Sequence, residues 1–271
     1  MHVDQDAYRR LHEALLDYEQ DALDRDVLGP WLDANAAERD WLRSFARAQG
    51  AQVPSARIED LWRLYALGRV NELMLLAFQR GRADGSDWPG PPIAPDEHAA
   101  FMQALGLAVE RPAAFSPFFH EIVEVEPAAE DDRPIELLGC VWPCLMLGDL
   151  LIGRAGARVR GGARFVSKAV AESSTLYWAY RRKNRPYEDL SHGWGGNSQW
   201  RTRFRRDYRL GGRLHYNVDG EDDLAIAPAD ADRDGLTRAE RVELLVNRCF
   251  VTSARAHADL WPYDDRLSVP A

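Results

Sequence analysis

The sequence predicts an α+β fold in which an N-terminal helical layer packs with an antiparallel β-sheet of about five strands and a C-terminal helix closes the structure. Three observations predict this class. Apolar residues recur at helical spacing near the N-terminus, segments in the middle of the chain alternate apolar and polar side chains, and a capping pattern precedes a last amphipathic stretch. We assign residues 1–110 to the helical region and residues 111–271 to the sheet with the last helix, and we expect one compact unit.

Four helices are expected in the N-terminal region. The first covers residues 6–23, where apolar side chains recur every three or four positions. The second follows Asn35, because this residue and Glu38 match a capping box. A third follows Ser55, before apolar residues at helical spacing, and Asp96 is the expected cap of a fourth that ends near Gly106.

Strands are expected in the middle of the chain. Residues 118–126 alternate in the manner of a strand, and residues 174–183 are rich in residue types that favour strands. Glycines punctuate residues 148–162, which predicts turns between short strands. Further on, Thr237 and Glu240 form a second capping box, which predicts the start of the last helix.

A β-hairpin is predicted around two adjacent glycines. A loop of two residues would place the apolar side chains of its strands on opposite faces, because a shift of one residue inverts every side chain. A loop over residues 211–213 instead pairs Leu210 with Leu214 and Tyr208 with Tyr216 on one face. We therefore predict the longer loop.

Composition excludes several classes of protein. The 271 residues are 46% apolar, and 34 basic against 43 acidic residues give a net charge of −9, which disfavours nonspecific binding to nucleic acid. Three cysteines are too few for a disulfide framework. The longest apolar run, residues 137–147, is shorter than the roughly 18 residues of a membrane span. With no secretory signal in view, we expect a cytoplasmic protein.

Positive charge is concentrated in one part of the chain. Residues 181–213 hold ten Arg or Lys side chains against three acidic ones, whereas residues 119–136 and 219–234 are strongly acidic. One interpretation is that ion pairs neutralise the arginines within the fold, for example Arg205 with Asp219 across the hairpin. The other is a surface that binds an anionic small ligand or an acidic protein partner.

A glycine-rich loop precedes the arginine-rich strand. Residues 189–200 combine glycines, which let a backbone approach a ligand, with side chains that donate and accept hydrogen bonds. The alternative is an ordered turn whose tryptophans fill the core. The candidate ligand-binding residues are Arg201, Arg203, Arg205, Arg206, Trp194, Asn197, Ser198 and Gln199.

Catalysis would need a general acid and a general base. The candidates are His192 in the loop and His120, Glu121 and Glu124 in the expected strand, with Arg201 or Arg206 stabilising negative charge. A buried or surface-paired histidine is the structural alternative. The strand lacks the second histidine that a zinc-protease helix requires.

No metal or cofactor is expected. Asp230, Asp232 and Asp234 match the first positions of a calcium loop, but Arg241 stands where that loop requires a carboxylate. The leading hypothesis is a binding or interaction protein that engages a protein partner or an anionic small ligand. The alternative is a hydrolase or a transferase of an anionic group, built on a His/Glu acid–base pair.

Overall fold

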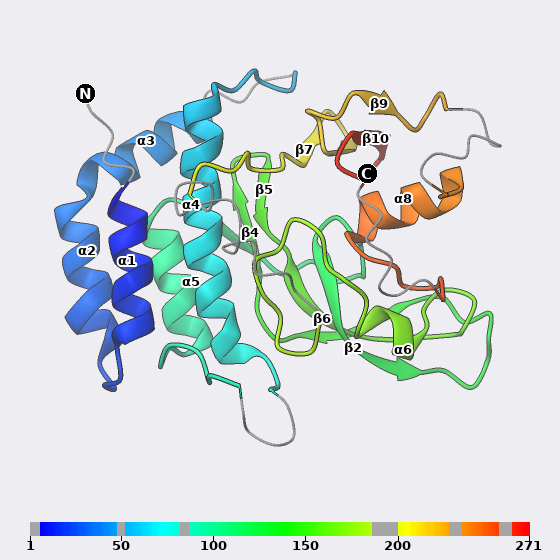
Figure 1. Ribbon diagram of the computed structural model, residues 1–271, viewed down its shortest axis with the longest axis horizontal. Helices are drawn as coiled ribbons and strands as arrows, with labels where there is room; N and C mark the ends of the chain where they lie inside the picture. The colour runs from blue at the N-terminus through cyan, green and yellow to red at the C-terminus, as the bar shows by residue number, and fades with distance from the viewer. Residues whose placement is uncertain (1–5, 48–51, 82–86, 186–199, 228–234, 255–261) are drawn as a thin grey trace.

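The helices within residues 6–104 form one layer, at the left in Figure 1, whereas the helices of residues 168–171 and 238–247 lie at the right, with strands between. The computed structural model describes residues 6–47, 52–81, 87–185, 200–227, 235–254 and 262–271. Four of the N-terminal helices were expected, but the first ends at Asp17 instead of residue 23, and Asp96 lies in the first turn of the fourth, whose N-cap is Ala94. The helical elements are α1 (Asp6–Asp17), η1 (Asp24–Leu28), α2 (Gly29–Ala34), α3 (Ala36–Arg47), α4 (Ile58–Leu75), η2 (Leu76–Phe78), α5 (Pro95–Ala104), α6 (Lys168–Ala171) and α8 (Arg238–Asn247).

Helix α4 connects the helical layer to the sheet. It contacts α1 on one side and β5 on the other, and most of its side chains are buried. Leu64 and Leu67 of this helix share one apolar core with Leu145 and Tyr208 from the sheet, so that core takes side chains from both sides of residue 110. Although α4 has 18 residues, none of the described helices is long and apolar enough to cross a membrane.

Two mixed sheets replace the single antiparallel sheet of about five strands. The larger has seven strands in the order β1-β4-β5-β7-β8-β10-β9, and the smaller has three in the order β2-β6-β3. Because β10 runs parallel to β9 and β2 runs parallel to β6, the antiparallel prediction was wrong, as was the strand number. The strands are β1 (Ala108–Glu110), β2 (His120–Pro127), β3 (Glu136–Cys140), β4 (Cys144–Leu147), β5 (Leu150–Gly153), β6 (Ala155–Gly161), β7 (Tyr208–Leu210), β8 (Arg213–Tyr216), β9 (Asp222–Asp223) and β10 (Asp265–Pro270).

The sequence predicted some of these elements correctly and others wrongly. Strand β2 confirms the strand expected over residues 118–126. Residues 174–183 form turns and bends instead of the expected strand. Trp178 in that segment has a φ of 54°, a left-handed conformation that interrupts a strand. The helix α8 does not end the fold either, because β10 follows it and pairs with β8.

The hairpin between β7 and β8 has the shorter loop, so the predicted register was wrong. Tyr208 pairs with His215, and Gly211 and Gly212 form a two-residue loop with φ values of 60° and 70°, which suit glycine. Tyr208 therefore enters the core beneath the helices, whereas Leu214 enters a second core on the opposite face. The prediction assumed one apolar face, but this hairpin is buried on both.

The predicted ion pair between Arg205 and Asp219 is also wrong by one position. Arg206 binds Asp219 through Nη2 and Nε, at 2.6 and 2.8 Å, and Arg205 turns inward to the buried Asp207. Regular strand structure begins only at Tyr208, so the alternation assumed for the preceding arginines does not apply to them.

Helix starts show which side chains act as caps. The capping box of α8 is confirmed: Glu240 accepts a hydrogen bond from the backbone N–H of Thr237, and the Thr237 hydroxyl accepts one from the Glu240 N–H. The box expected before α3 is wrong, because the Glu38 carboxylate is buried and binds Arg63 and the hydroxyl of Tyr8. The Glu38 side chain therefore forms a tertiary ion pair with Arg63 and does not cap the start of α3.

Candidate functional site

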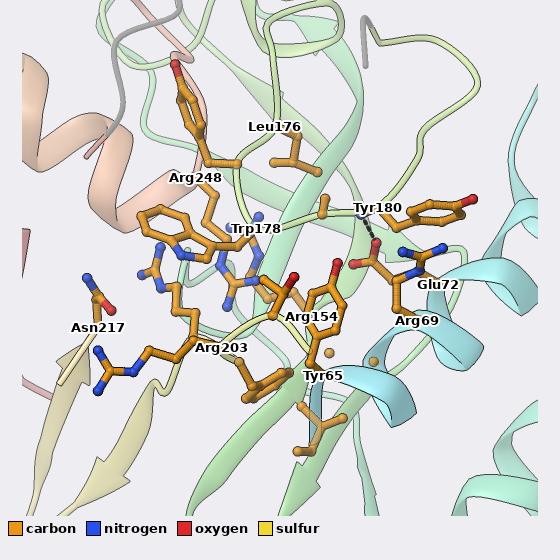
Figure 2. A pocket seen from close by; sticks show the side chains of 18 of the residues that line it. Tyr65, Arg69, Glu72, Arg154, Leu176, Trp178, Tyr180, Arg203, Asn217 and Arg248 are labelled. Atoms are coloured by element: carbon orange, nitrogen blue, oxygen red, sulfur yellow. Dashed lines mark hydrogen bonds between the residues drawn. The ribbon is translucent and has the colours of Figure 1, made fainter. Parts of the chain in front are cut away.

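A cavity of about 530 Å³ lies between the helical layer and the larger sheet. Its walls come from α4, from Glu121 of β2, from the end of β5, from residues 176–180, 182 and 202–205, from residues after β8, from Arg248, and from the two residues before β10. Figure 2 shows Arg203, Trp178 and Arg248 on one side of the cavity and Glu72 with Tyr180 on the other. This volume falls in the range of small-molecule sites.

Backbone strain is concentrated around this cavity. Among the described residues, three that are not glycine have positive φ values: Trp178 at 54°, Asn217 at 47° and Arg248 at 61°. All three line the cavity. Such conformations cost on the order of 1–3 kcal/mol each, and they cluster at functional sites. The cavity is therefore the strongest candidate site in the described part of the chain.

One buried carboxylate holds these strained segments together. Asp207 Oδ1 accepts hydrogen bonds from Arg205 Nε at 2.8 Å and from the backbone N–H of Asn217 at 2.7 Å. Its Oδ2 accepts one from Arg248 Nη2 at 3.0 Å. Burial alone would raise the pKa of Asp207, but the two guanidinium groups outweigh it and lower this pKa below its ordinary value.

Positive charge exceeds negative charge beside this carboxylate. In the described part of the chain, Arg205 and Arg248 have Asp207 as their shared carboxylate partner, so two guanidinium groups face one acid. Arg205 Nη1, Arg248 Nε and Arg154 Nε are also buried without a hydrogen-bond partner. An unsatisfied buried donor costs about 1–3 kcal/mol. A bound anion would offset both the charge and the missing hydrogen bonds.

The crowding of arginines is reflected in their pKa values. Burial, together with repulsion from Arg248, lowers the pKa of Arg154 to about 9 and that of Arg205 to about 10, although Asp207 partly opposes the shift of Arg205. Both side chains remain protonated near pH 7. An anion bound among these guanidinium groups would relieve their mutual repulsion.

A chain of ion pairs forms another part of the wall. Arg182 donates from Nε and Nη2 to the two carboxylate oxygens of Glu121, at 2.6 and 2.9 Å, and it also contacts Glu72 at 3.3 Å. Arg154 lies 4.0 Å from the same Glu121. Burial alone would raise the pKa of Glu121, but Arg182 and Arg154 lower it to about 2. Glu121 is therefore ionised near pH 7 and saturated with cationic partners.

Aromatic rings complete the walls. The guanidinium of Arg205 lies 4.3 Å from the ring centroid of Trp178, and the edge of Tyr263 meets the same indole at 5.0 Å. At the other side, Arg69 lies 3.7 Å from the ring centroid of Tyr180. These contacts hold the rings in place by cation–π and edge-to-face attraction.

The arginines proposed from the sequence separate into two groups. Arg203 and Arg205 line the cavity, and Arg203 is exposed, with no partner among the described residues. Arg206 forms an ion pair with Asp219 and donates a hydrogen bond to the carbonyl oxygen of Pro54. Arg201 is exposed outside the cavity lining, 5.8 Å from the ring centroid of Trp62.

The proposed acidic and basic residues lie in different surroundings. His120 is buried beside Phe115, with Nδ1 at 3.0 Å from the Ser116 carbonyl oxygen, and burial lowers its pKa. Glu124 lies near the surface and pairs with Arg158 at 3.2 Å. Glu121 is the catalytic candidate that lines the cavity. The candidates His192, Trp194, Asn197, Ser198 and Gln199 lie outside the described residues.

Several lining residues were not singled out from the sequence. Arg154 follows β5 and Arg248 ends α8, and each is remote in the chain from the arginine-rich segment. Arg154 lies beside Glu121, and Arg248 binds Asp207, a buried carboxylate next to the cavity. No local pattern distinguishes these residues, because their carboxylate partners are far away in the chain.

Metal ligation has no support in the described part of the chain, where no group of three or more His, Cys, Asp or Glu side chains could hold a metal ion. The proposed calcium-loop residues Asp230, Asp232 and Asp234 lie outside the described residues. Comparison of the chain with protein-family models, with curated proteins and with solved structures gave no match. The geometry of the cavity is thus what points to a function.

Proposed function

We propose that this protein binds a small organic anion in the cavity beside Asp207. The observation that carries the proposal is the excess of guanidinium groups: Arg205 and Arg248 share one carboxylate, and both keep a buried N–H without a partner in the described part of the chain. Exposed Arg203 adds a further positive charge at the same cavity. Charge-assisted hydrogen bonds from arginine suit carboxylates and phosphates.

The ligand is an organic anion because the lining also offers aromatic surface, although it contains carboxylates such as Glu72, Glu121 and Asp219 as well. Trp178, Tyr180, Tyr65 and Phe204 supply ring surfaces around the same space. A concave site of this kind suits a small molecule, whereas a protein partner is typically bound by a flatter surface. Binding, not acid–base catalysis, has the stronger support, since Glu121 is already saturated by Arg182.

Calorimetric titration with inorganic phosphate, phenyl phosphate and benzoate tests the proposal. We expect the two aromatic anions to bind, with an affinity that falls as salt is added. Replacing Arg203 with glutamine removes one exposed charge and should weaken binding about tenfold, the effect of losing one hydrogen bond to a charged group.

The matched control is Arg201→Gln. Arg201 is exposed like Arg203 and only two positions away, but it lies outside the cavity lining. This variant should bind the aromatic anions with unchanged affinity. Failure of both aromatic anions to bind, or an equal loss in the Arg201 and Arg203 variants, would overturn the proposed function.

A further inference from the structure

A buried amide faces the same cavity. Asn71 of α4 lines the cavity and is only 2% exposed. Its Oδ1 is hydrogen bonded to His98 Nε2 at 2.8 Å, but its Nδ2 has no partner among the described residues. An amide NH₂ group has two donors, and this one belongs to a side chain that lines the cavity. The free amide nitrogen is therefore available to a ligand.

His98 fixes the direction of this amide. The imidazole is fully buried in the helical layer, and burial lowers its pKa to about 4, so the ring is neutral near pH 7. A neutral ring that carries its hydrogen on Nε2 donates to Asn71 Oδ1. With its oxygen bound in this way, the amide keeps its NH₂ group turned away from His98.

Gly153 leaves room beside the amide nitrogen. A Cβ on Gly153 would lie 3.0 Å from Asn71 Nδ2, and Gly153 also lines the cavity. Leu75, one helical turn along α4, and Ile152, next to Gly153, line it too. The amide therefore donates from a mostly apolar wall, where a hydrogen bond is stronger than in water.

We propose that the ligand carries an uncharged hydrogen-bond acceptor, such as a ring carbonyl, besides its anionic group, and that Asn71 selects ligands by this acceptor. This inference rests on the proposed function, because it concerns the other end of the same ligand. The ligand class is then an anion with an aromatic or other apolar body and a neutral acceptor. Asn71 is the specificity-determining residue and His98 is its positioning residue.

Matched pairs of ligands test the inference. The probes are benzoates that carry either an acetyl or an isopropyl group at the meta or para position, because these groups have similar shapes and only acetyl accepts a hydrogen bond. The readout is the ratio of the two dissociation constants, measured by calorimetry or ligand-observed NMR. We expect the native protein to bind an acetyl compound about fivefold more tightly than its isopropyl partner, the effect of one hydrogen bond.

Variants assign this preference to the amide. Asn71→Leu should remove the acetyl preference while the isopropyl compound still binds. His98→Phe should reduce the preference, because Oδ1 loses its donor, and His98→Gln should restore it, because a glutamine N–H can replace Nε2. A purely structural role for His98 would change all affinities together and leave the ratio unchanged.

The outcomes separate this inference from the proposed function. If the benzoates bind but acetyl has no advantage at either position, or if Asn71→Leu keeps the advantage, the selection by Asn71 is wrong and anion binding stands. If no aromatic anion binds the native protein, both proposals are wrong. Gly153→Ala provides a further check, since its added carbon would crowd the amide nitrogen and should lower the acetyl preference.

Discussion

Between pH 7.5 and pH 5, the free energy of unfolding should fall by about 2 kcal/mol less in the His98→Gln variant than in the native protein. Burial lowers the pKa of His98 from 6.5 to about 4 in the folded chain. The unfolded chain therefore takes up this proton below about pH 6.5, whereas the folded chain takes it up only near pH 4. Stability from the neutral ring is complete above pH 6.5 and is lost progressively as the pH falls toward 4.

The magnitude follows from the two pKa values. At pH 5 an unfolded histidine is almost fully protonated and folded His98 is mostly neutral, so protonation favours the unfolded chain by about 2 kcal/mol. At pH 7.5 the difference is close to zero. His12, whose pKa burial lowers to about 4, should contribute a similar loss in the same interval. Carboxylates with lowered pKa values, such as Glu121, lose their contribution only below about pH 4.5.

Urea denaturation followed by tryptophan fluorescence measures this difference at the two pH values. His98→Gln keeps a donor for Asn71 and has no proton to take up, so it should lose about 2 kcal/mol less than the native protein on acidification. The matched variant His12→Gln should behave alike, and the double variant should show both effects added. If His98→Gln loses as much stability between pH 7.5 and 5 as the native protein, the neutral buried state of His98 is wrong.

Three further predictions concern stability. Gly212→Val should cost about 1–2 kcal/mol because the φ of 70° disfavours a branched side chain, and Gly212→Asn should cost less; equal losses in thermal unfolding would contradict the two-residue turn. Gly156→Ala should cost about 1–3 kcal/mol in urea titrations because its Cβ would lie 2.5 Å from the Trp142 ring, and a neutral effect would mean that the indole moves freely. Glu38→Gln should cost about 3–5 kcal/mol because it leaves the buried Arg63 charge without its carboxylate, and a loss below 1 kcal/mol would show that Arg63 reaches water.

Much of the local structure follows from the sequence. Apolar spacing predicts α1, α3 and α4, alternation predicts β2, and the Thr237 box predicts the start of α8. These features depend on contacts between residues a few positions apart, so their physical causes are present in a short segment.

The hairpin shows where local reasoning fails. The alternation around Tyr208 and Leu214 identified the apolar residues correctly. It did not show whether one face or both faces of the hairpin would be buried. Helix α4 and its neighbours lie over one face and a second core over the other, so the two-residue loop satisfies both sets. Register is a property of the layers on both sides of a strand, which no single segment specifies.

The candidate site depends still more on the tertiary structure. The charge pattern of the sequence predicts an arginine cluster near residues 203 and 205, and both of these arginines line the cavity. Only the fold brings Arg154, Arg248 and Asn71 to the same cavity and buries Asp207 against Arg248. Whether an arginine is neutralised or left to bind an anion depends on the carboxylates and dielectric around it, and these are set by residues far apart in the chain.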